Sequence, residues 1–392
     1  RYNQVRQMET TMNSYERVMA AYNKQRSDHV PIYCGSVSSR IASQVMGRTM
    51  YVGGGIQQYR ESLARFNGEE AHREFVEKSR QDAFDWAQAM DFDYVRPSYW
   101  RYQYKPVKML DDVTFYYERE DGTHWIMRYF DEYELFACIE DTKKDIEDVD
   151  LLEDEVVNQE EYNKRYVPKI SMHNEYLDTM SYFKNEKATY TSGVALAIPN
   201  TRQIWYEAVA SRPDLVERYL EAHTQRALMN IPLIASVGAK IAYGGGDCAC
   251  NRGLIYSNEI FKKLMVPRLR RISDKCHEYG LFHVFGSDGY FWDVADDLYI
   301  HSGIDAHYEA DCSCGMDIRS IRTRYPNITV VGGIASSTLD KKSQDDVKAE
   351  VTKAVSAAKE LSGAIVGCSN LVAPTTPINN FMLMMELLHK YK

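Results

Sequence analysis

Polar side chains, mostly carboxylates and thiols, recur in this sequence directly after short apolar runs. The residues are Cys34, Ser36, Arg96, Tyr99, Asp247, Cys248, Cys250, Ser287, Asp288, Glu309, Asp311 and Cys368. Thiolates, carboxylates and histidines are the usual ligands of Zn²⁺, and carboxyl and phenol groups also transfer protons in catalysis. These residue types predict an active site if the fold brings the ends of the apolar runs together.

Several of the cysteines can be explained by an ordinary structural role as well as by a role in metal binding or catalysis. Cys34 is of the size and polarity that fill a hydrophobic core. The pairs Cys248/Cys250 and Cys312/Cys314 lack the C-x₂-C spacing of zinc ribbons, and such isolated pairs are more often incidental. Spacing alone therefore does not assign these thiols to a metal.

Two histidines and one aspartate also fit either a structural or a functional role. His283 and His307 lie inside apolar runs, where a histidine is either a ligand or a satisfied core residue. Asp247 fits a catalytic acid–base role and fits equally an N-cap or a turn.

Eight apolar, β-branched runs contain or precede these residues. They span residues 29–35, 92–97, 188–195, 239–244, 281–286, 304–310, 328–333 and 364–368. From the third onward, helix-like stretches separate them, an alternation typical of parallel βα units. Eight parallel strands close into a barrel, and barrel active sites lie at the carboxyl ends of the strands. We therefore predict a (β/α)₈ TIM barrel over residues 29–392, preceded by an N-terminal helical segment, residues 1–28.

One region departs from this alternation. Residues 105–136 alternate like hairpin strands around Asp121 and Gly122, and an acidic stretch follows to about residue 161. We interpret residues 105–161 as an insertion between the second and third barrel strands. Its tyrosines and tryptophan suit a roof over the active site, and they suit an ordinary half-buried hairpin as well.

Composition narrows the class of protein. Hydrophobic residues make up 44% of the chain, which is enough for a large core. The balance of 47 basic and 56 acidic residues gives a net charge of −9 without a basic stripe, so we expect no nucleic-acid partner. No apolar run reaches 18 residues, so we expect no membrane span. Eight scattered cysteines without a secretory signal indicate free thiols and a cytoplasmic location.

From Tyr243 to its end, the sequence resembles the uroporphyrinogen decarboxylase superfamily. The resemblance is carried by GGGDCACNRGLIYSNEIFKKLMVPRLRRI, by FGSDGYFWDVADDLYIHSGIDAHYEADCSCGMDIRSIRTRYPNITVVGGI and by IVGCSNLVAPTTPINNFMLMMELL. The N-terminal HVPIYCGSVSSRIASQVMG is more loosely similar to the first strand and loop of that family. The resemblance implies one of two chemistries, porphyrinogen decarboxylation or methyl transfer involving corrinoid proteins.

Family motifs favour the second chemistry. The decarboxylases carry an arginine-rich loop after the first strand to hold many substrate carboxylates, whereas residues 35–40 here are GSVSSR. The zinc-dependent methyltransferases place His-x-Cys after strand five, Glu after strand six and Cys after strand eight. Glu309 and Cys368 match the last two positions. In one register Gly286 and Asp288 stand where the first pair would be, and in the other His283 and Phe285 do, so the pair is absent in both.

The resemblance thus implies an O-demethylase-like methyltransferase. Its methyl group would come from a small methoxylated, aromatic substrate and go to the Co(I) of a corrinoid protein partner. Zinc held by Glu309, Cys368 and Asp288, or by His307 in place of Asp288, would contact the ether oxygen. Without metal, Glu309 or Tyr99 would act as the acid.

The remaining assignments complete this hypothesis. Asp247 is a third candidate catalytic residue, and Arg96, Ser36, Cys34 and Asp288 are candidate substrate-binding residues. Two alternatives stay open: a decarboxylase-like lyase acting on a smaller acid without any cobalt protein, and a catalytically degenerate barrel that binds a corrinoid or another ligand. Aldol cleavage ranks last, because no strand-end lysine stands out.

Overall fold

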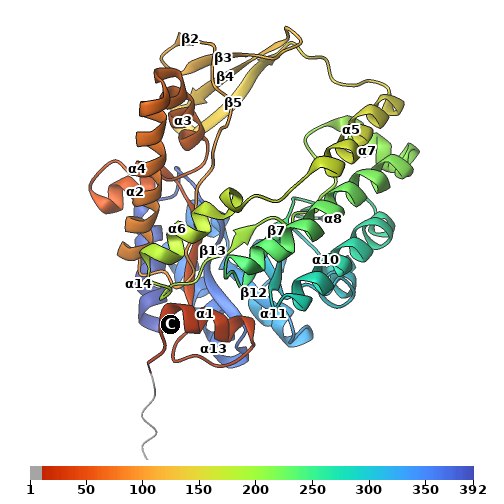
Figure 1. The fold of residues 1–392 in the computed structure, drawn as a ribbon. Helices are drawn as coiled ribbons and strands as arrows, with labels where there is room; N and C mark the ends of the chain where they lie inside the picture. Colours follow the sequence, from red (N-terminus) through yellow and green to blue (C-terminus); the bar gives the residue numbers. More distant parts are fainter. Residues whose placement is uncertain (1–10) are drawn as a thin grey trace, which may run out of the picture.

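The structure, a computed structural model, describes residues 11–392. Part of the predicted N-terminal helical segment, residues 1–10, lies outside the described residues. Helix α1 (Ser14–Tyr22) begins with a capping box in which the side chains of Asn13 and Glu16 each bind the other's backbone N–H. Val18 and Tyr22 of α1 pack into the interior of the barrel, and Figure 1 shows α1 at the end of the molecule opposite strands β2 to β5. Helix α1 therefore closes the amino-terminal end of the barrel.

A curled sheet of seven parallel strands forms the centre of this α/β fold. Its order is β1 (Ile32–Val37), β13 (Ala364–Val372), β12 (Thr329–Ile334), β11 (Ala306–Ala310), β10 (Phe282–Gly286), β7 (Ile241–Gly245) and β6 (Thr191–Ser192). Isolated parallel bridges from Tyr33 to Tyr94 and from Tyr94 to Ala188 connect β1 to the chain just before β6. The architecture is therefore TIM-barrel-like.

The second predicted strand, residues 92–97, contributes only the bridge residue Tyr94. Two of its polar side chains bind the backbone of β1, in addition to the backbone bond from Asp93 N to Ile32 O at 2.9 Å. The Asp93 carboxylate accepts a hydrogen bond from Ile32 N at 2.9 Å, and Arg96 Nη1 donates to Gly35 O at 2.7 Å. These side-chain bonds supplement the isolated backbone bridges at Tyr94.

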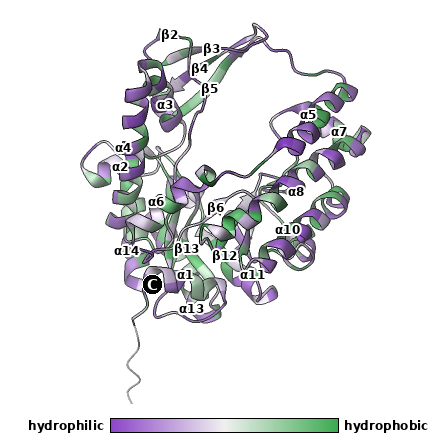
Figure 2. Cartoon of the chain, in the orientation of Figure 1, coloured by the Kyte–Doolittle hydropathy of each residue, from purple (hydrophilic) through white to green (hydrophobic). Residues whose placement is uncertain are grey.

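Helices surround the sheet and present hydrophilic outer faces (Figure 2). They are α2 (Ser39–Met46), α3 (Gly55–Asn67), α4 (Glu69–Ala89), α5 (Leu152–Arg165), α6 (Asn174–Tyr182), α7 (Gln203–Ser211), α8 (Pro213–Ser236), α9 (Asn258–Ile260), α10 (Val266–Glu278), α11 (Ile318–Arg324), α12 (Ser336–Lys341), α13 (Gln344–Leu361) and α14 (Ile378–Tyr391). Strands β8 (Ala249–Cys250) and β9 (Gly253–Leu254) form a small hairpin. Within residues 11–392, no helix is long and apolar enough to span a bilayer.

Alternation along the strands separates two cores. Tyr33, Tyr190 and Tyr308 belong to the cluster inside the barrel, whereas Cys34 and Cys368 belong to the larger cluster between strands and helices. Because successive side chains of a strand point to opposite faces, this parity decides which residues can reach the barrel interior.

The segment predicted to alternate like a hairpin forms a four-stranded antiparallel sheet. Its strands are β2 (Lys108–Asp111), β3 (Thr114–Glu118), β4 (His124–Phe130) and β5 (Leu135–Asp141), paired in that order. Phe115, Tyr117 and Phe136 form its core, packed against Tyr59 and Leu63 of α3. In the chain the sheet lies between Tyr94 and β6, and in Figure 1 it lies at the end of the molecule opposite α1.

Candidate active site

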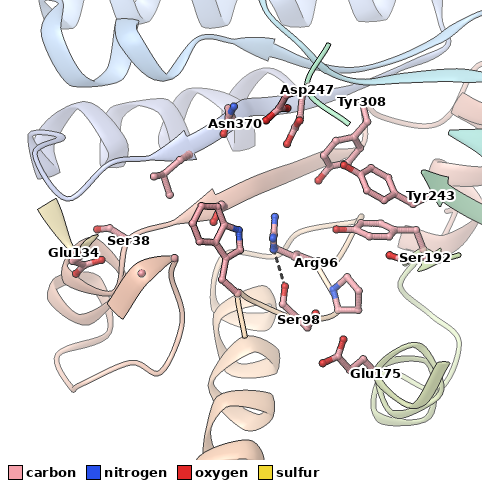
Figure 3. A pocket seen from close by; sticks show the side chains of 18 of the residues that line it. Ser38, Arg96, Ser98, Glu134, Glu175, Ser192, Tyr243, Asp247, Tyr308 and Asn370 are labelled. Atoms are coloured by element: carbon pink, nitrogen blue, oxygen red, sulfur yellow. Dashed lines mark hydrogen bonds between the residues drawn. The ribbon is translucent and has the colours of Figure 1, made fainter. Parts of the chain in front are cut away.

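A cavity of about 570 Å³ lies at the carboxyl ends of the barrel strands. Tyr190, Tyr243 and Tyr308 form an aromatic wall, and Figure 3 shows Tyr243 and Tyr308 facing the same space as Asp247 and Arg96. Burial raises the pKa of all three phenols, so they stay protonated and can donate hydrogen bonds. The cavity therefore combines flat apolar surface with fixed polar groups, as small-molecule sites do.

Glu309 reaches this cavity through an irregularity in β11. The β11–β12 register shifts between Tyr308 and Ala310, and Glu309 has a φ of +72°. In a regular strand Glu309 would point to the same side as His307, toward the helices. The bulge turns its side chain to the mouth of the barrel, and bulges beside active sites commonly redirect a side chain in this way. A non-glycine residue at positive φ costs on the order of 1 kcal/mol or more, so the surrounding structure must enforce this conformation.

The surroundings of Glu309 favour its protonated form. Its pKa is raised to about 7, first by burial and then by the negative charges of Asp288 and Asp247, while Arg96 opposes the rise. The pKa of Asp288 is raised too, by burial and by Asp247, although Asp288 accepts a hydrogen bond from Asn370 Nδ2 at 3.0 Å. Glu309 thus exchanges a proton near neutral pH, where general acids work best.

Arg96 is held rigidly beside this carboxyl. Its Nε donates to Ser98 O and its Nη1 donates to Gly35 O, both at 2.7 Å, and its guanidinium lies 5.4 Å from the ring centre of Tyr99. A guanidinium has five N–H donors, so further donors remain for a bound oxygen. Figure 3 shows the group in the middle of the cavity.

Comparison with known proteins places the chain in a family. The family described as uroporphyrinogen decarboxylase (URO-D) matches residues 200–391, the half that contains Asp247, Asp288 and Glu309. Residues 200–391 of this chain thus belong to the uroporphyrinogen decarboxylase family. A search of curated proteins finds no match.

One solved structure is similar in fold to almost the whole of this chain. A methyltransferase from Methanosarcina mazei matches with a TM-score of 0.63 and 14% identity over 97% of this chain and 99% of that chain. An IOLI protein with a bound zinc atom reaches 0.28 at 10% identity over 61% and 94% of the two chains. A xylose isomerase-like TIM barrel protein from Mycobacterium smegmatis, in complex with magnesium, reaches 0.30 at 12% over 57% and 80%. At these identities the first match establishes a shared fold, and the other two are too distant to add to it.

Four of the sequence-predicted residues meet in the cavity of this family member. Ser36, Arg96, Asp247 and Glu309 all line it. Asp288 lies directly behind it, bonded to the lining residue Asn370. Barrel topology brings these residues together even though more than 270 positions separate the first from the last.

Cys34 and Tyr99, predicted to bind substrate and to act as an acid, are instead buried beside the cavity. The Cys34 thiol donates to Ser36 O at 3.3 Å, and burial raises its pKa well above the ordinary value. The ring of Tyr99 packs under Arg96, and burial raises the pKa of its phenol. Both residues support Ser36 and Arg96 rather than lining the cavity.

The predicted zinc ligands lie on two sides of the barrel wall. Cys368 faces the helices, 3.5 Å from Ser336 Oγ, and burial raises the pKa of its thiol to about 11. His307 also faces outward; its Nδ1 lies 2.7 Å from Tyr299 Oη and its Nε2 lies 2.8 Å from Ser287 O, and burial lowers its pKa to about 4.

These contacts occupy both ring nitrogens of His307, so neither is available to a metal that Glu309 could reach. Within residues 11–392, no group of three or more His, Cys, Asp or Glu side chains is placed to hold a metal ion. The donors present therefore do not fit the predicted site of Glu309, Cys368 and Asp288 or His307.

Sequence reasoning missed the aromatic wall and one amide. Tyr243 and Tyr308 stand at inward positions of predicted strands, and strict alternation from the buried apolar residues would have found both. Asn370 has the same parity as Cys368, which faces the helices, so alternation gives no signal that Asn370 lines the cavity. Glu134, which also lines the cavity, comes from the antiparallel sheet and has no such signal.

Proposed function

We propose that this family member is a methyltransferase that moves a methyl group from a methoxylated aromatic substrate to the Co(I) of a corrinoid protein. The observation that carries the proposal is Glu309, a carboxyl with a pKa of about 7 that a bulge turns into an aromatic-walled cavity. Breaking a methyl–oxygen bond leaves a negative oxygen, which is a poor leaving group. A proton donor beside that oxygen is therefore what the reaction requires.

The proposed step balances as a proton-assisted displacement. The acceptor donates an electron pair to the methyl carbon, the methyl–oxygen bond breaks, and its electron pair stays on the oxygen. Glu309 gives its proton to that oxygen and is left as a carboxylate, which the nearby Arg96 charge stabilises. The demethylated product leaves as a neutral hydroxyl compound, and Glu309 takes up a new proton from solvent.

Cavity shape supports an aromatic donor and a large partner. A volume of about 570 Å³ lies within the usual range for small-molecule sites. The mouth is rimmed by the exposed side chains of Trp100, Tyr133, Leu135 and Met172, from three separate segments of the chain. Exposed apolar side chains gathered at one mouth are typical of an interaction surface, and we assign this rim to the corrinoid protein.

Acid catalysis by Glu309 replaces the metal in this scheme. Because Cys368 and His307 face the helices, we route no step through zinc. The remaining assigned roles are Arg96 for binding the substrate oxygen, Ser36 for lining its pocket, and Asp247 with Asp288 for keeping Glu309 protonated.

Methyl transfer from a panel of methoxyaromatics to a Co(I) corrinoid protein tests the proposal. We expect Glu309→Gln to lower kcat by about 10²–10⁴-fold, the usual worth of a general acid. Cys368→Ala removes a thiol outside the cavity, so it serves as the control and keeps kcat within about threefold. Absence of transfer from every donor would contradict the proposal and favour a lyase acting on a smaller acid or a ligand-binding barrel.

A further inference from the structure

The turn between β4 and β5 contacts the barrel at the beginning of α2. The Glu134 carboxylate accepts hydrogen bonds from Ser39 N at 2.9 Å and from Arg40 N at 2.7 Å. The Arg40 guanidinium in turn donates to Asp131 O at 2.7 Å. The first amides of a helix have no partner within the helix, and a carboxylate there also meets the positive end of the helix dipole. The two parts of the chain are thus joined by charge-assisted bonds in both directions.

Glu134 occupies a backbone conformation that does not suit a glutamate. Its φ is +47°, in the left-handed region where glycine and asparagine are common and other residues are strained. It is also only 6% exposed, an unusual setting for a carboxylate. Glycine would relieve the strain at this position, so the side chain itself accounts for the residue.

Close backbone packing surrounds the same turn. A Cβ atom added at Gly55, the first residue of α3, would lie 2.5 Å from Glu134 O and 2.5 Å from Phe136 N. The turn therefore lies directly against α3 as well as α2, without room for adjustment by side chains.

Both sides of this contact contribute to the wall of the cavity. Tyr133 and Leu135 flank Glu134, and Ser36 and Ser38 precede the two amides that it binds; all four line the cavity. Figure 3 shows Ser38 and Glu134 on the same side of it. A change in the Glu134 contact would shift Tyr133 and Leu135 relative to the barrel.

We propose that Glu134 is a positioning residue whose carboxylate fixes the antiparallel sheet to the β1–α2 loop and thereby sets the shape of the substrate cavity. Its effect on turnover rests on the proposed methyl transfer, whereas the contact itself does not. The competing interpretation is that Glu134 merely caps α2, in which case its loss changes stability and leaves substrate binding as it was.

Amide hydrogen exchange of the free protein tests the contact without any assay of function. Glu134→Gly relieves the strained backbone but removes the carboxylate, and Glu134→Gln keeps the side chain but removes its charge. We expect Glu134→Gly to speed exchange at Ser39 and Arg40 and across residues 131–136 by at least about tenfold, with the barrel strands unchanged. Glu134→Gln should give a smaller effect. Glu132→Gln, an exposed change on the same turn, is the matched control and should leave exchange unchanged.

Kinetics of the same variants separate positioning from capping. We expect Glu134→Gly to raise KM for the methoxyaromatic at least about tenfold with kcat within threefold, and Glu134→Gln to restore part of the loss. Wild-type exchange at Ser39 and Arg40 in Glu134→Gly, or a lowered Tm with KM unchanged, would overturn the proposal. If the wild-type protein transfers no methyl group, the proposed function fails. Hydrogen exchange at Ser39, Arg40 and residues 131–136 still tests the Glu134 contact, because it needs no assay of function.

Discussion

At the scale of single residues, the candidate site depends on one carboxyl, Glu309, whose pKa is raised by burial and by neighbouring charges. Burial contributes most to the raised pKa of Glu309, and the charge of Asp288 comes next. The contribution of Asp288 can be tested by substituting that side chain, and the contribution of burial can be tested by measuring stability at two pH values.

Removal of the neighbouring charge should move the pH profile. Asp288→Asn deletes the negative charge that raises the pKa of Glu309, so that pKa falls and the acid form is lost at lower pH. We expect the alkaline limb of kcat to shift downward by about half a pH unit or more, measured between pH 5 and 9. Glu386→Gln, on the outer face of α14, is the control and should leave the limb in place. An unmoved limb in Asp288→Asn would show that Asp288 does not influence the acid.

Burial of Glu309 also makes stability depend on pH. Because its pKa is raised from 4.5 to about 7, the folded state binds more protons than the unfolded state between these values. The contribution of Glu309 to the free energy of unfolding is therefore fully present below about pH 4.5 and is lost as the pH rises through 7. Relative to their difference at pH 4, Glu309→Gln should gain on the order of 3 kcal/mol over the wild type at pH 8. Urea unfolding at both pH values measures this, and an unchanged difference would contradict the burial of Glu309.

At the scale of elements, the alternation of side chains along each strand, together with interruptions such as bulges, decides which side chains face the barrel interior. Seven of the eight predicted runs became strands, because their apolar pattern suits a sheet covered by helices. The run 92–97 forms only isolated bridges at Tyr94, and Asp93 and Arg96 also bind β1 through their side chains. Sequence patterns show that such residues are polar, but they do not show which backbone group each one will bind.

The hydrogen bonds of the Asp93 side chain lead to a prediction about stability. Asp93→Ala leaves Ile32 N–H without its side-chain partner and removes one of the two carboxylates that Arg17 binds, the other being Asp28. We expect the free energy of unfolding to fall by about 2–4 kcal/mol, the usual cost of breaking a buried charged hydrogen-bond network. Glu77→Ala, an exposed change on α4, should alter it by less than about 0.5 kcal/mol. Equal losses in urea titrations of the two variants would refute this role for Asp93.

Strand parity also explains which predicted site residues lie outside the cavity. Cys368 and His307 lie within β13 and β11, yet each points toward the helices, and a shift of one residue in register would have reversed both. Glu309 shares the parity of His307 and reaches the cavity only through its bulge. A bulge has no fixed sequence signature outside glycine, so the sequence could place Glu309 at the strand end without predicting its direction.

At the scale of the whole molecule, topology was the most predictable feature. Parallel strands joined by helices bring all carboxyl ends to one side, which is why Ser36, Arg96, Asp247 and Glu309 could be grouped from sequence. The division into residues 1–28 and 29–392, and the assignment of residues 105–161 as an insertion, stay predictions. Contacts between distant segments, such as Glu134 with Ser39, depend on packing that no local pattern encodes.

The pH dependence of methyl transfer by the wild type and Glu309→Gln tests the central claim most directly. Transfer from a methoxyaromatic to a Co(I) corrinoid protein is followed in single turnovers between pH 5 and 9. We predict that the wild-type rate falls above an apparent pKa near 7, where Glu309 loses its proton, and that Glu309→Gln is slower by about 10²–10⁴-fold without this limb. A wild-type rate that does not change across this range, or a Glu309→Gln rate within threefold of it, would contradict the account.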